Sequence, residues 1–409
     1  MKAKECEGLG FATKVIHVEQ VHDSEYGSMI TPIYQTASYC HGSVEEAAEK
    51  FAHKLPGFHP IYSRSGNPTN RALELKIAAI EGGEDAVTAA SGMGAIGSVL
   101  IGFLQAGDHA IFDDTLYGGT DHIVKHNLPA LGIQTSIVNL RDFDALKKAI
   151  RPNTKLVYFE TPNNPVLTLN DVAAIKATVG KDIKVVVDGT FAPPPLQYVL
   201  KLGADVVVHS LTKYYNGHGD AIGGIVVGSK ADIALVRNNA MTKINGCPLS
   251  PFNSFLILRG MKTMALRMNQ CCHNAQALAE YLVSNEYIKK VNYPGLTTHP
   301  QYDLAVKQMT KGLYGGMISF ELKDDINGLS SFAAGKKLVN GLKIATIATS
   351  LGDPDTLISH PASMTHAFVA PTDRLASGIT DGLVRMSVGL EDVEDLINDF
   401  KAVFATFNK

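Results

Sequence analysis

A lysine that closely follows a buried strand is the residue of this chain best suited to covalent chemistry. Lys213 comes soon after the apolar run 206–208, within the segment VVVHSLTKYYNGHGD. An ammonium group at such a position must be paired, desolvated or used covalently, and desolvation lowers its pKa toward that of a usable nucleophile. A lone lysine in a loop would more often point into solvent. The residues around Lys213 decide between these interpretations.

Hydroxyl and carboxylate groups accompany this lysine. Ser210 and Thr212 flank it with hydroxyls that suit a phosphate, and Asp188 closes the strand sequence VVVDGT. An aspartate at the end of a buried strand can hold a pyridinium nitrogen protonated, which keeps a ring cofactor an electron sink. Taken alone, Asp188 could equally cap the following turn. Together with Lys213, these residues favour a cofactor held as a Schiff base.

A glycine-rich helix start gives a second phosphate signal. The segment SGMGAIG (91–97) follows a strand and opens the apolar helix predicted over 95–103, so its backbone N–H groups point beyond the helix N-terminus. Its glycines also spell G-x-G-x-x-G, and Asp113 and Asp114 follow, which is the pattern of a dinucleotide site. An NAD-dependent dehydrogenase is therefore the rival interpretation. It gives no role to the lysine or to the strand-end aspartate discussed above.

Two further groups of residues have weaker signals. Tyr117, in DDTLYGGT, could lie against a flat ring because the glycines after it allow a close turn, although a lone tyrosine is more often a core residue. His209, His218 and Asp220 could suggest a metal, but their spacing fits no familiar ligand pattern and the intervening glycines favour a turn. No metal is expected.

The elements that must position these residues indicate an α/β fold. From about residue 68 the chain alternates helical and strand patterns, which predicts a mostly parallel sheet with helices on its faces. Asn67 can cap the first of these helices, Pro68 suits its first turn, and Gly82 can end it. Short apolar runs predict buried strands. These runs are residues 85–89, 109–112, 155–159, 184–187, 205–208 and 224–227. Polar residues follow several of them, at the edge where open α/β sheets bind ligands.

The two ends of the chain differ from this middle part. A long helical pattern around 251–286 leads to fresh strands and a final amphipathic helix, which predicts a smaller C-terminal α+β domain. The first sixty or so residues lack a clear rhythm and are interpreted as an extended arm. We therefore predict an N-terminal arm over 1–64 that reaches a neighbouring subunit, a large domain over 65–265 and a C-terminal domain over 266–409.

Composition excludes several classes of function. The 37 Lys and Arg nearly balance the 40 Asp and Glu, and no long basic tract occurs, so neither nucleic acid nor a membrane surface is expected as a partner. Five cysteines without CxxC spacing argue against a disulfide scaffold or a zinc knuckle and favour the reducing cytosol. The chain shows neither a signal peptide nor an apolar run long enough to span a bilayer. A cytoplasmic enzyme with a small-molecule substrate is expected.

Taken in chain order, these motifs resemble the Cys/Met-metabolism family of pyridoxal 5′-phosphate (PLP) enzymes, which includes methionine γ-lyase, cystathionine γ-lyase, cystathionine γ-synthase and O-acetylhomoserine sulfhydrylase. The resemblance covers nearly the whole chain. It rests on YSRSGNPT from Tyr62, SGMGAI from Ser91, LYGGT from Leu116, ETPNNP from Glu160, VVVHSLTKYYNGHGD, SLGDPDTLISHPASMTH and GLVRMSVGLED around Arg385. It implies PLP as cofactor, an amino-acid substrate and the aspartate-aminotransferase-like fold of PLP-dependent transferases (fold type I).

The resemblance also assigns roles to matching positions. Lys213 would carry PLP as a Schiff base, and Tyr117 would stack on the ring and protonate the departing sulfur, so these two are the expected catalytic residues. The implied cofactor-binding set is Gly92, Met93, Tyr117, Asp188, Ser210, Thr212 and Lys213, completed by Tyr62 and Arg64 of a neighbouring subunit. Asn164, Ser350 and Arg385 would hold the substrate carboxylate, which arginine binds in a two-pronged way. A homotetramer of paired active dimers is implied.

Departures from the family patterns bear on the substrate. Ile61 and Thr349 stand where cystathionine enzymes tend to carry acids, and His122 stands where cystathionine γ-lyases tend to carry arginine. These changes disfavour the distal ammonium group of cystathionine. An apolar and uncharged pocket fits a short thioether better.

Other departures count against a standard methionine γ-lyase pocket. Those enzymes usually have cysteine at the position of Gly119 and a Lys-Asp pair at the positions of Thr242 and Lys243, and Gly189 replaces the usual asparagine of the family. We nevertheless predict a methionine γ-lyase-like α,γ-elimination that gives a thiol, ammonia and 2-oxobutanoate. The alternatives are a cystathionine γ-lyase, a γ-replacement transferase of the O-acetylhomoserine sulfhydrylase type, a catalytically silent PLP binder and, more remotely, the dehydrogenase.

Overall fold

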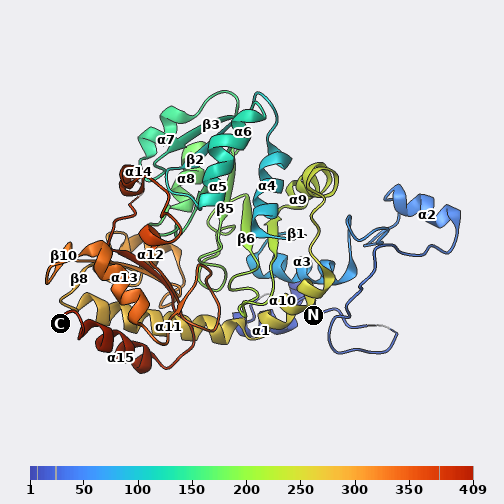
Figure 1. Cartoon of the computed structure of the whole chain (residues 1–409). Helices are drawn as coiled ribbons and strands as arrows, with labels where there is room; N and C mark the ends of the chain where they lie inside the picture. Colours follow the sequence, from blue (N-terminus) through green and yellow to red (C-terminus); the bar gives the residue numbers. More distant parts are fainter. Residues whose placement is uncertain (7, 24, 377, 409) are drawn as a thin grey trace.

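The computed structural model describes residues 1–6, 8–23, 25–376 and 378–408. A seven-stranded sheet lies at its centre, with the strand order β1-β7-β6-β5-β4-β2-β3 (Figure 1). The strands are β1 (Asp85–Ala89), β2 (His109–Asp113), β3 (Gln134–Val138), β4 (Thr154–Glu160), β5 (Lys184–Asp188), β6 (Val206–Ser210) and β7 (Gly224–Gly228). The pairs from β3 to β6 are parallel, and only β7 runs antiparallel to its neighbours β6 and β1. The predicted mostly parallel sheet is confirmed.

All six predicted strands are present, and β3 is the strand that the sequence did not reveal. Its sequence, QTSIV, lies at one edge of the sheet and contains only exposed and partly buried residues. The other strands are almost fully buried because helices cover both faces of the sheet. A search for continuous apolar runs therefore finds the central strands and misses this edge strand.

Helices flank the sheet on its two faces. They are α3 (Pro68–Glu81), α4 (Gly92–Phe103), α5 (Gly118–His122), η2 (Ile123–Asn127), α6 (Leu128–Ala130), α7 (Phe143–Ala149), α8 (Val172–Val179), α9 (Lys230–Val236), η3 (Arg237–Asn245) and α10 (Pro251–Met261). One buried cluster joins α4 to Val186 and Val208, whereas the other joins α3, α8 and α10 to Val187 and Val207. Successive residues of one strand thus pack on opposite faces, as the two-residue period of a strand requires.

Side-chain caps begin two of these helices, and the sequence predicted the cap of the first. The Asn67 side chain accepts the N–H of Thr69 at 2.9 Å and begins α3, which ends at Gly82 with a left-handed φ of 81°. The Ser91 hydroxyl accepts the N–H of Gly94 at 3.0 Å. Because Ser91 is the N-cap, α4 begins at Gly92, three residues before the predicted start. The glycine-rich segment is therefore the first turn of the helix itself.

The C-terminal part forms a smaller unit around a mixed sheet with the order β12-β13-β14-β9-β8. Its strands are β8 (Ile288–Asn292), β9 (Met317–Leu322), β12 (Thr346–Ile347), β13 (Leu357–Ser359) and β14 (Leu383–Ser387), and β10 (Asp325–Ile326) pairs separately with β11 (Leu329–Ser330). Its helices are α11 (Met264–Val283), α12 (Tyr302–Gln308), α13 (Ser331–Gly341), η4 (Pro361–Ser363), α14 (Pro371–Ala376) and α15 (Val393–Phe404). The helical pattern predicted around 251–286 is divided between α10 and α11, which a break at residues 262–263 separates.

The N-terminal segment is not uniformly extended. It contains η1 (Ala3–Cys6), α1 (Phe11–His17) and α2 (Val44–Phe51). Helix α1 packs on the core through Val15, whereas α2 has no buried residue and stands away from the body (Figure 1). Within the predicted arm, α1 thus packs against the core and α2 does not, while contact of the arm with a neighbouring subunit stays a prediction. In the described part of the chain, no helix is both long and apolar enough to cross a membrane.

A buried lysine beneath α1 makes stability depend on pH in the alkaline range. Lys76 Nζ donates to the carbonyl oxygens of Val15 and Ile16 at 3.1 and 3.2 Å. Burial lowers the pKa of Lys76 to about 8. The unfolded chain keeps this proton to a higher pH, so the unfolded state binds more protons above pH 8 and the contribution of Lys76 to stability rises with pH.

We therefore expect the free energy of unfolding of the wild type, relative to Lys76→Met, to rise by about 1 kcal/mol between pH 7 and pH 9. Urea denaturation of both proteins at the two pH values measures this difference, and the comparison cancels the titration of other groups. A difference that stays constant or falls over this range would contradict the assignment.

Candidate active site

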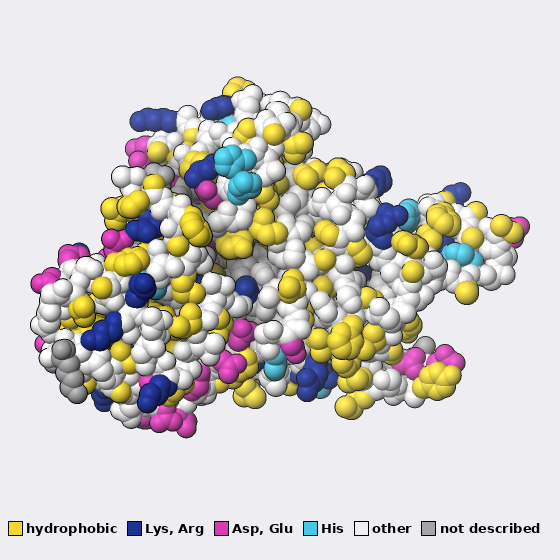
Figure 2. All heavy atoms as spheres, in the orientation of Figure 1, with side chains coloured by type: hydrophobic (Ala, Val, Ile, Leu, Met, Phe, Trp, Pro, Cys, Tyr) yellow, Lys and Arg dark blue, Asp and Glu magenta, His cyan; other side chains and the backbone are white. Residues whose placement is uncertain are grey.

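A cavity of about 620 Å³ lies at the carboxyl ends of β4, β5 and β6, where the surface is hollowed beside the C-terminal unit (Figure 2). It brings together every residue that the sequence and the resemblance proposed for the site except Tyr62 and Arg64. These residues are Gly92, Met93, Tyr117, Asn164, Asp188, Ser210, Thr212, Lys213, Ser350 and Arg385. Segments far apart in the sequence, from both sheets, thus form one wall.

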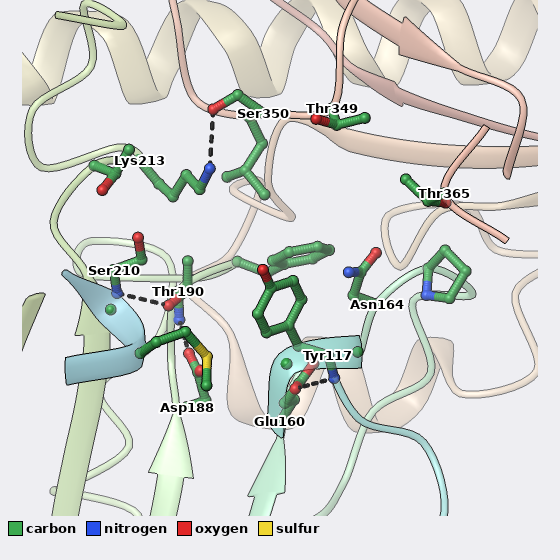
Figure 3. A pocket seen from close by; sticks show the side chains of 18 of the residues that line it. Tyr117, Glu160, Asn164, Asp188, Thr190, Ser210, Lys213, Thr349, Ser350 and Thr365 are labelled. Carbon is green, nitrogen blue, oxygen red and sulfur yellow. Dashed lines mark hydrogen bonds between the residues drawn. The ribbon is translucent and has the colours of Figure 1, made fainter. Parts of the chain in front are cut away.

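Lys213 reaches into this cavity from the loop after β6. Its Nζ donates to the Ser350 hydroxyl at 2.9 Å, a contact between the central part and the C-terminal unit (Figure 3). Burial and the nearby Arg385 guanidinium lower the pKa of Lys213. Because a larger fraction of the amine is then unprotonated at neutral pH, Lys213 is suited to attack a carbonyl carbon.

Asp188 ends β5 with its carboxylate at the cavity. Its Oδ1 accepts the N–H of Thr190 at 2.9 Å, and its Oδ2 accepts the hydroxyl of Tyr158 at 3.2 Å. The adjacent Gly189 has no room for a side chain, because a Cβ there would lie 2.6 Å from Cε1 of His209. Asp188 is therefore held by Thr190 and Tyr158 without the asparagine that is usual in the family.

The start of α4 is suited to bind an anion. A Cβ at Gly92 would lie 2.9 Å from the Cβ of Ser210, so glycine lets the first turn of α4 approach the end of β6 closely. The Thr212 hydroxyl accepts the N–H of Gly223 at 3.1 Å, which fixes the loop that follows. Backbone N–H groups and the helix dipole favour a phosphate at such a position.

Arg385 supplies a second anion-binding group from the middle of β14. Its side chain is buried, and its Cζ lies 5.4 Å from the centre of the Phe191 ring. Burial lowers the pKa of Arg385 to about 10, so the guanidinium remains charged at neutral pH. Its Nε has no hydrogen-bond partner among the residues that the structure describes. A buried charge that lacks a partner is costly, and a planar carboxylate would satisfy it.

Glu160 is a residue of the cavity that the sequence analysis did not single out. It ends β4, is opposite Asp188 in the parallel register, and accepts the N–H of Tyr117 at 2.5 Å (Figure 3). Tyr117 itself precedes α5 and has a half-exposed ring. The available signal was an acid that ends a buried strand, the same signal that identified Asp188.

Tyr62 and Arg64 lie outside this cavity. Arg64 Nη1 donates to the carbonyl oxygen of Thr242 at 2.7 Å, and its guanidinium lies 5.6 Å from the centre of the Tyr62 ring. Thr242 and Lys243 belong to η3 and are not part of the cavity wall either. One chain alone therefore does not unite these residues with Lys213.

The acid of the dinucleotide motif and the histidines of the possible metal site make other contacts. Asp113, the acid that the dinucleotide interpretation needs, accepts from Arg141 at 3.1 Å and from Asn170 at 3.0 Å, and does not line the cavity. His209 Nε2 lies 2.6 Å from Glu81 Oε1, whereas His218 contacts the carbonyl oxygen of Asn216. Within the described ranges, no three side chains of the metal-binding types converge.

The cavity thus combines an amine of lowered pKa, a carboxylate, an aromatic ring and two anion-binding positions. A cofactor that carries an aldehyde, a basic ring nitrogen and a phosphate fits this set. Lys213 would bind the aldehyde, Asp188 would hold the ring nitrogen, and the start of α4 with Ser210 would bind the phosphate. Arg385 remains for the carboxylate of a substrate.

Comparison with known proteins agrees with this chemistry. The model of the Cys/Met metabolism PLP-dependent enzyme family matches residues 12–405. L-Methionine γ-lyase from Treponema denticola is 47% identical over 404 residues, which are 98% of each chain. L-Methionine γ-lyase from Fusobacterium nucleatum subsp. polymorphum is 47% identical over 399 residues, covering 97% of this chain and 98% of that one.

Solved structures agree as well. The crystal structure of cystathionine γ-lyase from Lactobacillus plantarum, complexed with L-serine, superposes with a TM-score of 0.88 at 37% identity and covers 98% of this chain and 100% of that chain. The expected fold type and the expected cofactor, PLP, are thereby confirmed, and the dehydrogenase interpretation finds no support. The chain belongs to the Cys/Met metabolism family of PLP-dependent enzymes.

Proposed function

We propose that this protein is a carbon–sulfur lyase that acts on a sulfur-containing amino acid, with an α,γ-elimination of the methionine γ-lyase type. The observation that carries the proposal is the convergence of Lys213 and Arg385 in one cavity. An amine nucleophile and a carboxylate anchor are the two groups that an amino-acid substrate of a PLP enzyme requires. The products would be a thiol, ammonia and 2-oxobutanoate.

Different residues of the cavity would bind the cofactor and the substrate. PLP, when bound, supplies an electron sink for the negative charge that develops at the substrate Cα. Asp188 would hold a proton on the ring nitrogen, and the start of α4 with Ser210 and Thr212 would bind the phosphate. Arg385, Ser350 and Asn164 would hold the substrate carboxylate. They would thereby fix the Cα–H bond relative to Lys213.

Proton transfer falls to two residues of the chain. The amine of Lys213, once released from the cofactor, would take the proton from Cα and later move a proton at Cβ. Its lowered pKa suits a general base near neutral pH. Tyr117, whose hydroxyl-bearing ring faces the cavity, would protonate the departing sulfur. Elimination at Cγ needs both transfers, because the sulfur leaves only after charge develops at Cβ.

The wall near the substrate side chain favours a thioether. Thr349, which is uncharged, lines the cavity. A Cβ at Gly119 would lie 2.8 Å from both Met93 Sδ and Tyr117 Cε1, so these two side chains occupy the space of the cysteine that is usual in methionine γ-lyases. A sulfur and a ring carbon thus replace a thiol in the wall. A short apolar S-alkyl group suits such surroundings better than a second charged amino acid.

The departures at Gly119, Thr242 and Lys243 also keep a γ-replacement transferase as the second candidate. Such an enzyme would use the same groups and differ in the nucleophile that completes the reaction. An assay with methionine, cystathionine, homocysteine, cysteine and O-acetylhomoserine, with and without sulfide, separates the two. Formation of 2-oxobutanoate from methionine alone supports the lyase, and sulfide-dependent homocysteine formation without it supports the transferase.

We also propose a homotetramer in the cytoplasm, built from dimers that share their active sites. Residues 1–64 would form the arm that brings Tyr62 and Arg64 to the cavity of a neighbouring subunit, with the large domain over 65–265 and the C-terminal domain over 266–409. Apolar side chains exposed over α2 and near α10, Val44, Phe51 and Phe252, support a contact between copies (Figure 2).

Replacing the proposed nucleophile tests the chemistry directly. Lys213→Ala should lower turnover at least about 10³-fold because both the covalent anchor and the general base are lost. It should also remove the cofactor that borohydride fixes to the wild-type protein. The exposed Lys201 provides a control, since Lys201→Ala should retain both properties. Substantial elimination by Lys213→Ala would overturn the assignment.

The carboxylate anchor predicts a different kinetic effect. Arg385→Lys keeps the charge but loses the two-pronged geometry, so KM for methionine should rise about 10- to 100-fold. The visible spectrum of the bound cofactor should stay unchanged, because Arg385 is assigned to the substrate. An unchanged KM, or loss of the cofactor spectrum, would show that this arginine has another role.

Shared active sites can be tested by mixing two inactive variants. Arg64→Ala damages the phosphate site that a subunit lends to its neighbour, whereas Lys213→Ala damages the subunit's own cavity. Subunits exchanged between the two variants should recover about a quarter of wild-type activity, because half of the dimers would be mixed and each would contain one intact site. No recovery after demonstrated exchange would contradict sites shared between subunits.

A further inference from the structure

Three carboxyl groups end three adjacent parallel strands beside the cavity. Asp113 ends β2, Glu160 ends β4 and Asp188 ends β5, and β4 lies between the other two strands in the sheet. Glu160 pairs with Asp188 in the strand register. A row of three acids, of which Asp113 and Glu160 are buried and Asp188 is partly buried, is electrostatically costly unless each one is neutralised, by a cation or by a proton.

The two outer acids have their own cations, one of them supplied by the cofactor. Asp113 forms an ion pair with Arg141 at 3.1 Å. Asp188 would face the protonated ring nitrogen of PLP, so the inference below rests on the proposed function. The middle acid differs. Among the residues that the structure describes, no basic side chain forms an ion pair with Glu160, whose oxygen accepts the backbone N–H of Tyr117 at 2.5 Å.

The surroundings of Glu160 favour its neutral form. The residue is only 5% exposed, and burial, followed by the charge of Asp188, raises the pKa of Glu160 well above its usual range. The other titratable groups facing this position are Asp113 and the Tyr158 hydroxyl, which is bonded to Asp188. The backbone N–H groups of Tyr117 and Asn164 oppose the effect without reversing its direction.

We infer that Glu160 is a neutral carboxylic acid that positions Tyr117 and leaves Asp188 as the single carboxylate charge beneath the cofactor ring. The carbonyl oxygen of the acid accepts the Tyr117 N–H and fixes the residue from which the short helix α5 (Gly118–His122) begins. The Tyr117 ring is half-exposed. A second carboxylate charge at this place would change how tightly the ring nitrogen holds its proton.

Infrared difference spectroscopy on the PLP-loaded protein tests the protonation state. The wild type at pH 7 should show a carboxylic-acid C=O band that shifts in D₂O and is absent from Glu160→Gln. Glu74 is a matched control, because it is equally buried but bonded to Arg237 at 2.9 Å, with charged arginines that hold the pKa of its carboxyl below the usual range. Glu74→Gln should therefore leave the acid band in place.

Two variants of the same residue test the positioning role. Glu160→Gln keeps a neutral acceptor for the Tyr117 N–H. Its PLP affinity and the induced circular dichroism of PLP should therefore stay within about twofold of the wild type, and the visible band should have the same pH dependence. Glu160→Ala removes the acceptor and should bind PLP about tenfold more weakly, with reduced circular dichroism.

Each result decides one part of the inference. A wild type without the acid band, or an acid band that persists unchanged in Glu160→Gln, would show that Glu160 does not carry the proton and would overturn the inference. Equal defects in the glutamine and alanine variants would overturn the neutral-acceptor role in the same way. Failure of the proposed function can be told apart from failure of this inference. In the first case the wild-type protein would bind PLP without forming 2-oxobutanoate from methionine, and the infrared result on Glu160 would be unaffected.

Discussion

Desolvation of two cations in one cavity is the constraint on which the rest of the site depends. Lys213 and Arg385 are both removed from water, and the charge of the arginine lowers the pKa of the lysine further. The two residues respond differently because a guanidinium keeps its proton where an amine can lose it. One cation is thus suited to act as a nucleophile and the other as a fixed anion receptor. Their separation requires a rigid frame, which the central sheet provides for Lys213 and β14 provides for Arg385.

The parallel sheet provides the opposite charge. Parallel strands end at the same edge, so acids that end neighbouring strands are forced together whatever their individual roles. Here the sheet places Asp113, Glu160 and Asp188 in a row, and each would be neutralised in a different way. Arg141 forms an ion pair with the first, burial and the charge of Asp188 favour the neutral form of the second, and the ring nitrogen of PLP would pair with the third. The interaction of Asp188 with the ring nitrogen therefore depends on whether the neighbouring carboxyl groups are charged or neutral.

The sequence predicts the parts of this arrangement that depend on local pattern. Buried strands appear as continuous apolar runs, Asn67 is recognisable as a helix cap, and a polar residue after a buried run identifies Lys213 and Asp188. Edge strand β3 leaves no such run because water covers one side of it. Ser350 and Arg385 carry no local signal, and only the family resemblance indicates that they belong to the site. The contact of Ser350 with Lys213 arises from packing between units that are distant in sequence.

Glycines that depart from the family pattern follow a similar packing logic. At Gly189 the space of a side chain is already filled by His209, which in turn contacts Glu81 and stacks edge-on with Tyr215. At Gly119 that space is filled by Met93 and Tyr117. In both places the space that a side chain would take is occupied by neighbouring side chains, because close-packed interiors do not tolerate voids. The effect of glycine at position 189 or 119 on the site therefore depends on the side chains that fill the space beside it.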